Sequence, residues 1–329
     1  MILGRHRKPA PRLAAEVDDT ELGPVWRRLT GRGTGHTRVL VAPLVQRLLD
    51  DAGDDWDRRA HRLAVLTAST RPSTQRSWAQ HDSRHPDAHT LFAWEAMARG
   101  TRTPTADAEF DETVGAGVTA ARLRPHDPNP WVVRLGLLRQ RRRPRTEAFP
   151  VWREIAARDP WHREPHVQMY GYLSHREPHV QMYGYLSPRE CGSRAQSMEF
   201  GDRAQAAIPA TAPAAGLPLM ALIDRYHAAL SREGVHGLMA DRLRDGPEAS
   251  RVLDRALQAW TPAGQLRHAA ALADLNLLAY ALTAARDTAR VATVFGAVAG
   301  VVTPHPWGHG CYDPVLTFPH AQRRADATR

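Results

Sequence analysis

The chain has 329 residues, of which 43% are hydrophobic and 24% charged, the composition of an ordinary folded protein with one large or two medium domains. Its formal net charge of +9 is the difference between 44 basic residues, 43 arginines and one lysine, and 35 acidic residues. No apolar run approaches the roughly 20 residues of a membrane span, and the first residues lack the apolar core of a secretory signal. With only Cys191 and Cys311, a disulfide framework is not expected, so the sequence predicts a cytoplasmic protein.

Apolar residues recur at helical spacing through most of the chain and strand signals are almost absent, which predicts an all-α fold. The ends, residues 1–36 and 304–329, are rich in Pro, Gly, Arg and Thr and are predicted to be loosely ordered. In chain order, the apolar stripes of the first half are Leu44/Leu48/Leu49, Leu63/Leu66/Thr67, Leu91/Phe92/Trp94/Met97, Val118/Ala121/Leu123, Trp131/Leu135/Leu138 and Val151/Trp152/Ile155.

A stretch with three prolines, residues 208–218, is predicted to connect a helical-repeat region, residues 37–207, to a C-terminal helical region, residues 219–303. In the latter, Ala269–Leu282 is apolar on most sides and is predicted to be a central helix. Val291–Val298 is predicted to pair back onto it. Asp274 and Asn276 within the central helix are expected to be hydrogen-bonded buried residues rather than catalysts.

The segment from Asn129 to Pro160, NPWVVRLGLLRQRRRPRTEAFPVWREIAARDP, resembles a tetratricopeptide repeat, a helix–turn–helix unit of 34 residues. The matching positions are the pair Leu135-Gly136, the small crossing residue Ala148, the large aromatic Trp152 and the terminating Pro160. Two positions depart from the pattern, because Trp131 stands one place early and Arg139 occupies the first-helix tyrosine site. Repeat character extends over roughly Pro86–Phe200, and the chain also resembles uncharacterised helical-repeat proteins of actinobacteria.

This resemblance implies stacked antiparallel helix pairs that form a tetratricopeptide-like superhelix. It also implies a non-enzymatic module that binds another protein on its concave face, without a cofactor, a metal or a membrane. In that geometry the concave face comes from the first helix of each pair. The resemblance therefore implies binding positions at Val133, Leu137 and Arg141.

A tandem duplication lies at residues 162–187, where His162–Ser174 and His175–Ser187 are identical at all thirteen positions. Continuing the 34-residue register places Met182 at the next helix crossing, whereas deletion of one copy places Ala195 there. A small residue suits a crossing, so one of the two copies is interpreted as an insertion that the helical stack tolerates, and the sequence leaves open which copy keeps the original packing.

Two other classes of function stay open. A metal-dependent or hydrolytic enzyme would use one of the histidine clusters, and an Arg-rich nucleic-acid regulator would use Arg141–Arg143. The sequence contains no catalytic motif, and nucleic-acid binding is not expected because most arginines stand near acidic residues. The clusters whose metal binding the sequence leaves open are His162/His166, His175/His179 and His305/His309/Cys311.

Overall fold

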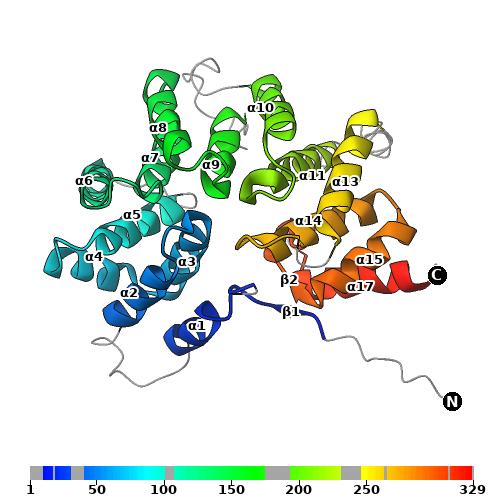
Figure 1. The fold of residues 1–329 in the computed structure, drawn as a ribbon, viewed down its shortest axis with the longest axis horizontal. Helices are drawn as coiled ribbons and strands as arrows, with labels where there is room; N and C mark the ends of the chain where they lie inside the picture. The colour runs from blue at the N-terminus through cyan, green and yellow to red at the C-terminus, as the bar shows by residue number, and fades with distance from the viewer. Residues whose placement is uncertain are drawn as a thin grey trace. The chain divides into compact units, whose positions relative to one another are not determined.

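A computed structural model describes residues 10–17, 19–30, 41–100, 107–174, 193–230, 246–262, 265–309 and 312–327 (Figure 1). In these ranges nearly all regular structure is helical, which confirms the all-α prediction. No helix in the described part of the chain is both long enough and apolar enough to cross a membrane. Contacts divide the chain into a continuous unit, Asp19–Arg203, and a split unit, Met1–Asp18 with Ala204–Arg329.

The continuous unit is built from helix pairs. Its helices are α1 (Leu22–Thr30), α2 (Val41–Asp51), α3 (Trp56–Ser69), α4 (Pro72–His81), α5 (Pro86–Gly100), α6 (Asp107–Leu123), α7 (Asn129–Gln140), α8 (Arg145–Arg158), α9 (Arg163–Leu173) and the start of α10 (Arg194–Ala207). From α3 to α9 each odd-numbered helix packs on the next odd-numbered helix, and the intervening helices pack beside them. The described helices of this unit therefore pack around one apolar core.

The residues that carry the repeat resemblance lie on α7 and α8. At Gly136 an added Cβ would overlap Met97 Sδ of α5 and lie 3.2 Å from Gln168 Oε1 of α9, so a larger residue there would force Met97 to move. Leu135 and Ala148 are fully buried. Trp152 packs edge-on against Phe200, with ring centroids 5.6 Å apart. The helices α7 and α8 thus form a helix–turn–helix, in which Gly136 lies at a close contact with α5 and α9.

We expect Gly136→Ala to lower the free energy of unfolding by about 1–3 kcal/mol, because the new methyl group overpacks the contact with Met97. Gly115 is the matched control. It lies in α6 with no atom near the position of an added Cβ, so Gly115→Ala should stabilise the protein by about 0.5–1 kcal/mol through helix propensity. Urea denaturation of both variants checks the opposite signs, and a stabilising Gly136→Ala would contradict the close crossing.

The first copy of the duplicated segment forms α9, with its N-cap at His162. Met169, Tyr172 and Leu173 are buried in the core of the continuous unit. The second copy, His175–Ser187, and Met182 within it, lie outside the described residues. In this chain, which carries both copies, Ala195 is exposed in the first turn of α10 and Ser197 is buried there, so the prediction that Ala195 reaches the crossing after deletion of one copy stays a prediction.

Deletion of His175–Ser187 is still expected to leave a folded protein. Because the two copies are identical, the remaining copy supplies every side chain that α9 now places in the core. The connection to α10 becomes thirteen residues shorter, which favours folding by on the order of 1 kcal/mol or less. Thermal melts of the two forms check this. A Tm more than ten degrees lower after deletion would show that both copies contribute to the core.

The split unit forms around one apolar helix. Its elements are β1 (Arg12–Leu13), η1 (Pro213–Gly216), α11 (Leu217–Leu230), α13 (Pro247–Trp260), α14 (Ala271–Ala284), α15 (Thr288–Val298), β2 (Val301–Val302), α16 (Pro304–Trp307) and α17 (Pro314–Ala327). The helix α14 packs against α11, α13, α15 and α16, which confirms the predicted central helix. The predicted packing of α15 against α14 is also confirmed, and Asp287 in the turn between them caps the N-terminus of α15.

The prediction of loosely ordered ends is wrong for the described parts of residues 1–36 and 304–329. Arg12–Leu13 pairs in parallel with Val301–Val302. Leu22 of α1 and Phe318 of α17 are fully buried. Few apolar residues are enough to order these short elements, because each one packs against a core that is already formed by longer helices.

The predicted domain boundaries also need correction. The division falls between Arg203 and Ala204, and residues 1–18 belong with the C-terminal helices instead of forming a separate segment. Residues 208–218 are not simply a connection, because they form η1 and the start of α11. Pro213 and Pro218 stand in the first turns of these helices, where a backbone N–H would have no partner within the helix. The absence of this N–H in proline therefore costs nothing there, and the two prolines mark helix starts.

Candidate binding site

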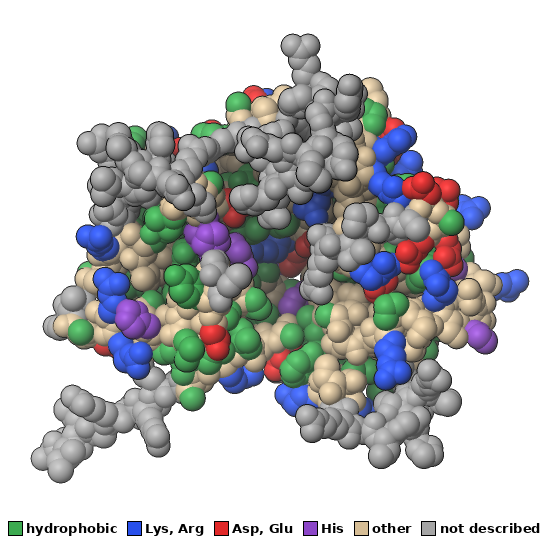
Figure 2. Space-filling view, turned by 180° about the vertical axis from the view of Figure 1, so that it is seen from behind, with side chains coloured by type: hydrophobic (Ala, Val, Ile, Leu, Met, Phe, Trp, Pro, Cys, Tyr) green, Lys and Arg blue, Asp and Glu red, His purple; other side chains and the backbone are tan. Residues whose placement is uncertain are grey.

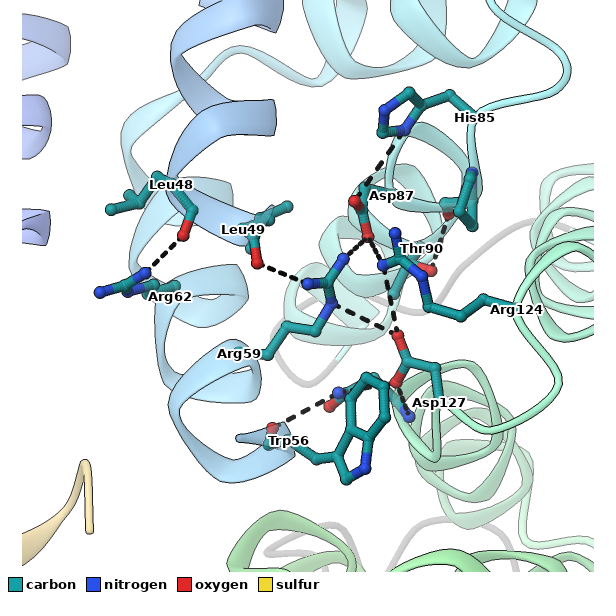
Figure 3. Close-up of polar contacts among 12 residues, drawn as sticks. Leu48, Leu49, Trp56, Arg59, Arg62, His85, Asp87, Thr90, Arg124 and Asp127 are labelled. Carbon is teal, nitrogen blue, oxygen red and sulfur yellow. Dashed lines mark hydrogen bonds and ion pairs between the residues drawn. The ribbon is translucent and has the colours of Figure 1, made fainter. Parts of the chain in front are cut away.

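Buried polar residues gather where α3, α5, α7 and α9 begin. Arg59 of α3 is 2% exposed and lies between two carboxylates, forming an ion pair with Asp87 and one of 3.4 Å with Asp127 (Figure 3). Arg124 reaches Asp87 at 2.8 Å. Asp87 lies in the first turn of α5 and Asp127 just before α7, positions where the helix dipole favours negative charge.

The same cluster continues to α9 through Asn129. Its Nδ2 donates to Asp127 Oδ1 at 2.9 Å, and its Oδ1 lies 3.2 Å from His162 Nε2. The backbone N–H of Arg163 donates to Asp57 Oδ1 of α3 at 3.3 Å. Burial raises the pKa of Asp127 to about 6, although the charge of Arg59 opposes this, and burial lowers the pKa of His162 to about 3.

This arrangement is suited to holding helices together. Arg59, Asp87, Asp127, Asn129 and His162 are all 2% exposed or less. None of them lines any of the three cavities at α11–α14, at η1–α13 or at α6–α7. A substrate would therefore not reach these groups, and we interpret the cluster as a structural junction of four helix starts.

The junction should make stability depend on pH in two opposing ways. An unfolded histidine has a pKa near 6.5, so below that pH the unfolded state takes up a proton that buried His162 resists, and stability falls by about 1.4 kcal/mol per pH unit. Below pH 6, native Asp127 takes up a proton that an unfolded aspartate does not bind until near pH 4, so stability rises with a similar slope.

In wild type we expect these effects largely to cancel between pH 6 and 4.5. In His162→Gln only the Asp127 effect remains, so acidification from pH 6 to 4.5 should raise the free energy of unfolding of this variant by on the order of 2 kcal/mol relative to wild type. In Asp127→Asn only the His162 effect remains, and the same acidification should lower its free energy of unfolding by a similar amount relative to wild type. Urea denaturation at both pH values tests this, and parallel pH dependence in all three proteins would contradict it.

A cavity of about 190 Å³ lies between α6 and α7 of the continuous unit. Apolar side chains and a glycine make up most of its lining, with two arginines among them and no acidic residue. The lining residues are Thr113, Val114, Gly117, Val118, Ala121, Arg122, Pro130, Trp131, Val133, Arg134 and Leu137. The small residues Gly117 and Ala121 leave room on α6 opposite Val133 and Leu137 of α7.

Trp131 forms one polar element beside this cavity. The guanidinium of Arg134 lies 5.9 Å from the centroid of its ring, and that of Arg158 lies 5.2 Å away. The indole Nε1–H is buried and has no acceptor among the described residues. Two guanidinium groups therefore lie near the ring, of which that of Arg158 also pairs with Glu154, and the indole donor is unused.

Two of the three predicted binding residues lie together here. Val133 and Leu137 are each 1% exposed and line the cavity, so a ligand would meet them only inside it. Arg141 does not line it. It caps the C-terminus of α7, where it forms an ion pair of 2.8 Å with Asp107 and lies over the Phe110 ring.

Sequence reasoning missed the polar lining residues Arg122, Trp131 and Arg134 and the contribution of α6. Arg134 could have been found, since residues 130, 133, 134 and 137 share one face of α7. The contribution of α6 could not be found this way, because its small residues only acquire meaning once α7 lies opposite them.

The rings of His162 and His166 do not face a common point. His162 lies just before α9, and His166 Nδ1 approaches the His162 carbonyl at 2.7 Å instead of its ring. In the split unit, His309 stacks on His227 with ring centroids 3.5 Å apart. His175, His179 and Cys311 lie outside the described residues, and among the described ones no three His, Cys, Asp or Glu side chains are placed to hold a metal ion.

The arginine-rich turn after α7 is engaged by neighbouring polar side chains. Arg143 forms an ion pair of 2.8 Å with Glu147, and Arg145 donates to Gln196. On the face shown in Figure 2, basic and acidic side chains are interspersed. Binding of nucleic acid at Arg141–Arg143 stays an untested alternative, and the described contacts of this turn do not add support to it.

Asp274 and Asn276 lie fully buried in α14. Asn276 Nδ2 donates to the Val301 carbonyl at 2.9 Å, and its Oδ1 accepts from Trp307 Nε1 at 2.9 Å. Asn276 is thus a hydrogen-bonded structural residue, as predicted. It joins the central helix to β2 and α16.

No family model, curated protein or solved structure matches this chain. Its function must therefore be inferred from the fold and from the α6–α7 cavity.

Proposed function

We propose that this chain is a protein-interaction module whose continuous unit binds a segment of another protein at the α6–α7 cavity. The observation that carries the proposal is the cavity itself, because its apolar floor includes Val133 and Leu137, which the repeat resemblance implied as binding positions. Stacked helix pairs commonly bind partners along such surfaces. A partner would insert one apolar side chain between the two helices.

The surroundings of the cavity support this use. Val118 in its lining and Leu123 at the end of α6 are each 41% exposed, although both are large and apolar. Exposed apolar residues next to a pocket lined by buried apolar residues are typical of a protein–protein interface. In such an interface the residues around the central pocket keep water away from it. The tetratricopeptide likeness of α7 and α8 supports the same function.

The test fills the cavity without disturbing its charges. A Cβ at Gly117 would meet only the Pro130 carbonyl, at 3.7 Å, so Gly117→Leu can extend into the cavity. Gly115→Leu is the matched control, because Gly115 is exposed on the same helix and does not line the cavity. Leu137→Glu would be unsuitable, since it would place a carboxylate at a position that is 1% exposed.

Both variants and wild type would be crosslinked in extracts of the native host, and the captured proteins quantified by mass spectrometry. We expect at least one protein to be captured by wild type and Gly115→Leu and lost with Gly117→Leu. Equal capture by all three folded proteins would contradict the proposal.

A further inference from the structure

The size of the α6–α7 cavity limits what can enter it. At about 190 Å³ it is smaller than the roughly 300–1,000 Å³ that drug-sized ligands and cofactors occupy. One apolar side chain of the size of leucine fits this space, in contact with Val114, Val133 and Leu137. The rest of any larger ligand would lie outside the cavity, on the surface of α6 and α7 around its opening.

The charged side chains that line the cavity are of one sign. Arg122 comes from the last turn of α6 and Arg134 from α7, so one guanidinium lies on each wall. Both side chains are exposed, and neither forms an ion pair with a described residue. No Asp or Glu lines the cavity, and the unused Nε1–H of Trp131 lies beside it. These three donors could all be met by the acceptor oxygens of a ligand.

On the basis of the proposed function, we infer that the partner segment is acidic, with an apolar anchor residue flanked by carboxylates. The anchor fills the cavity between α6 and α7. The carboxylates pair with Arg122 and Arg134, since guanidinium and carboxylate form charge-assisted and often bidentate hydrogen bonds. The two arginines lie on opposite walls, so a segment crossing the cavity places one acidic residue against each.

The test measures binding of defined peptides to the full chain by isothermal titration calorimetry. The probes are capped nonapeptides with a central Leu and one Glu on each side, with the Leu–Glu spacing varied from one to three residues. Matched peptides carry Gln for Glu, or Ala for Leu. Acetyl and amide caps remove the terminal charges, and one uncapped peptide shows whether a free C-terminal carboxylate can replace the flanking acids.

We expect the Glu–Leu–Glu peptide of best spacing to bind at least tenfold more tightly than its Gln and Ala counterparts, and more weakly at high salt. Arg122→Gln and Arg134→Gln should each weaken it about tenfold, while Arg84→Gln, an exposed arginine outside the cavity, should not. Gly117→Leu should abolish binding and Gly115→Leu should leave it unchanged. Melting curves confirm that each variant is folded.

Equal affinity for the Glu and Gln peptides, or no binding by any peptide of the series, would overturn the inference. A preference for the free C-terminus over the flanking acids would do so as well. The proposed function fails separately, when Gly117→Leu still captures every host protein that wild type captures. A partner lost with Gly117→Leu but retained by both arginine variants would leave the function standing and refute the acidic segment.

Discussion

Arg59→Met is expected to lower the free energy of unfolding of the continuous unit by about 3–5 kcal/mol. The substitution keeps much of the side-chain volume but removes the cation that lies between Asp87 and Asp127, each only 1% exposed. Two carboxylates are then buried close together with only the partly exposed Arg124 to compensate them, and an uncompensated buried charge costs several kcal/mol. Urea denaturation, with hydrogen exchange at α3 and α7 to identify the unit, measures the loss.

Two further variants separate charge burial from simple loss of an ion pair. Arg143→Met removes an exposed pair with Glu147 and should cost less than about 1 kcal/mol. Asp87→Asn, added to Arg59→Met, should recover part of the loss because it removes one of the stranded charges. A loss with Arg59→Met no greater than that with Arg143→Met would show that the junction contributes little to stability.

Asn276→Leu is expected to lower the stability of the split unit by roughly 2–4 kcal/mol. Leucine has a similar shape, so the effect comes from polar groups left behind: Trp307 Nε1–H loses its acceptor and the Val301 carbonyl loses a donor. Each unmet buried group costs about 1–3 kcal/mol. Thermal denaturation with near-ultraviolet circular dichroism, which reports on the buried tryptophans, follows this unit.

A double-mutant cycle with Trp307→Phe tests that explanation. In wild type, Trp307→Phe leaves the Asn276 carbonyl oxygen short of a donor, whereas in the Asn276→Leu variant it leaves no unmet partner at this contact. The second substitution should therefore cost clearly less in the Asn276→Leu background. Strict additivity would mean that the hydrogen bond is not the source of the effect.

Most of the longer helices could be predicted because they have an apolar stripe at helical spacing, and Gly136 could be predicted to lie at a close helix contact. The junction of buried polar residues could not be predicted from the sequence. Arg59 and Arg62 read as the polar face of an amphipathic helix, yet both are buried and paired with acids that stand 28 and 43 residues away in sequence. Pairing over such distances leaves no local pattern, because it depends on which helix ends meet in space.

The candidate site shows the same limit. Val133 and Leu137 follow from the register of one helix, and the structure places both in the cavity. Arg122 belongs to a different helix, and its role depends on an empty volume opposite α7 that small residues of α6 create. Both α6 and α7 line the cavity, so the residue pattern of α7 alone could indicate only the α7 part of the lining.

The contact between α3 and α9 has a consequence for how the continuous unit folds. In an open array of repeats each repeat touches only its neighbours, so terminal repeats can be removed or added and the rest survives. Here the first turn of α3 is bonded to the start of α9 through Asp57 and Arg163, and Asn129 of α7 donates to the Trp56 carbonyl at 3.4 Å. The starts of α3, α7 and α9 are thus bonded to one another although α3 and α9 are far apart in sequence. The helices of this unit should therefore melt together, and shortened versions that lack α9 should lose order as far away as α3.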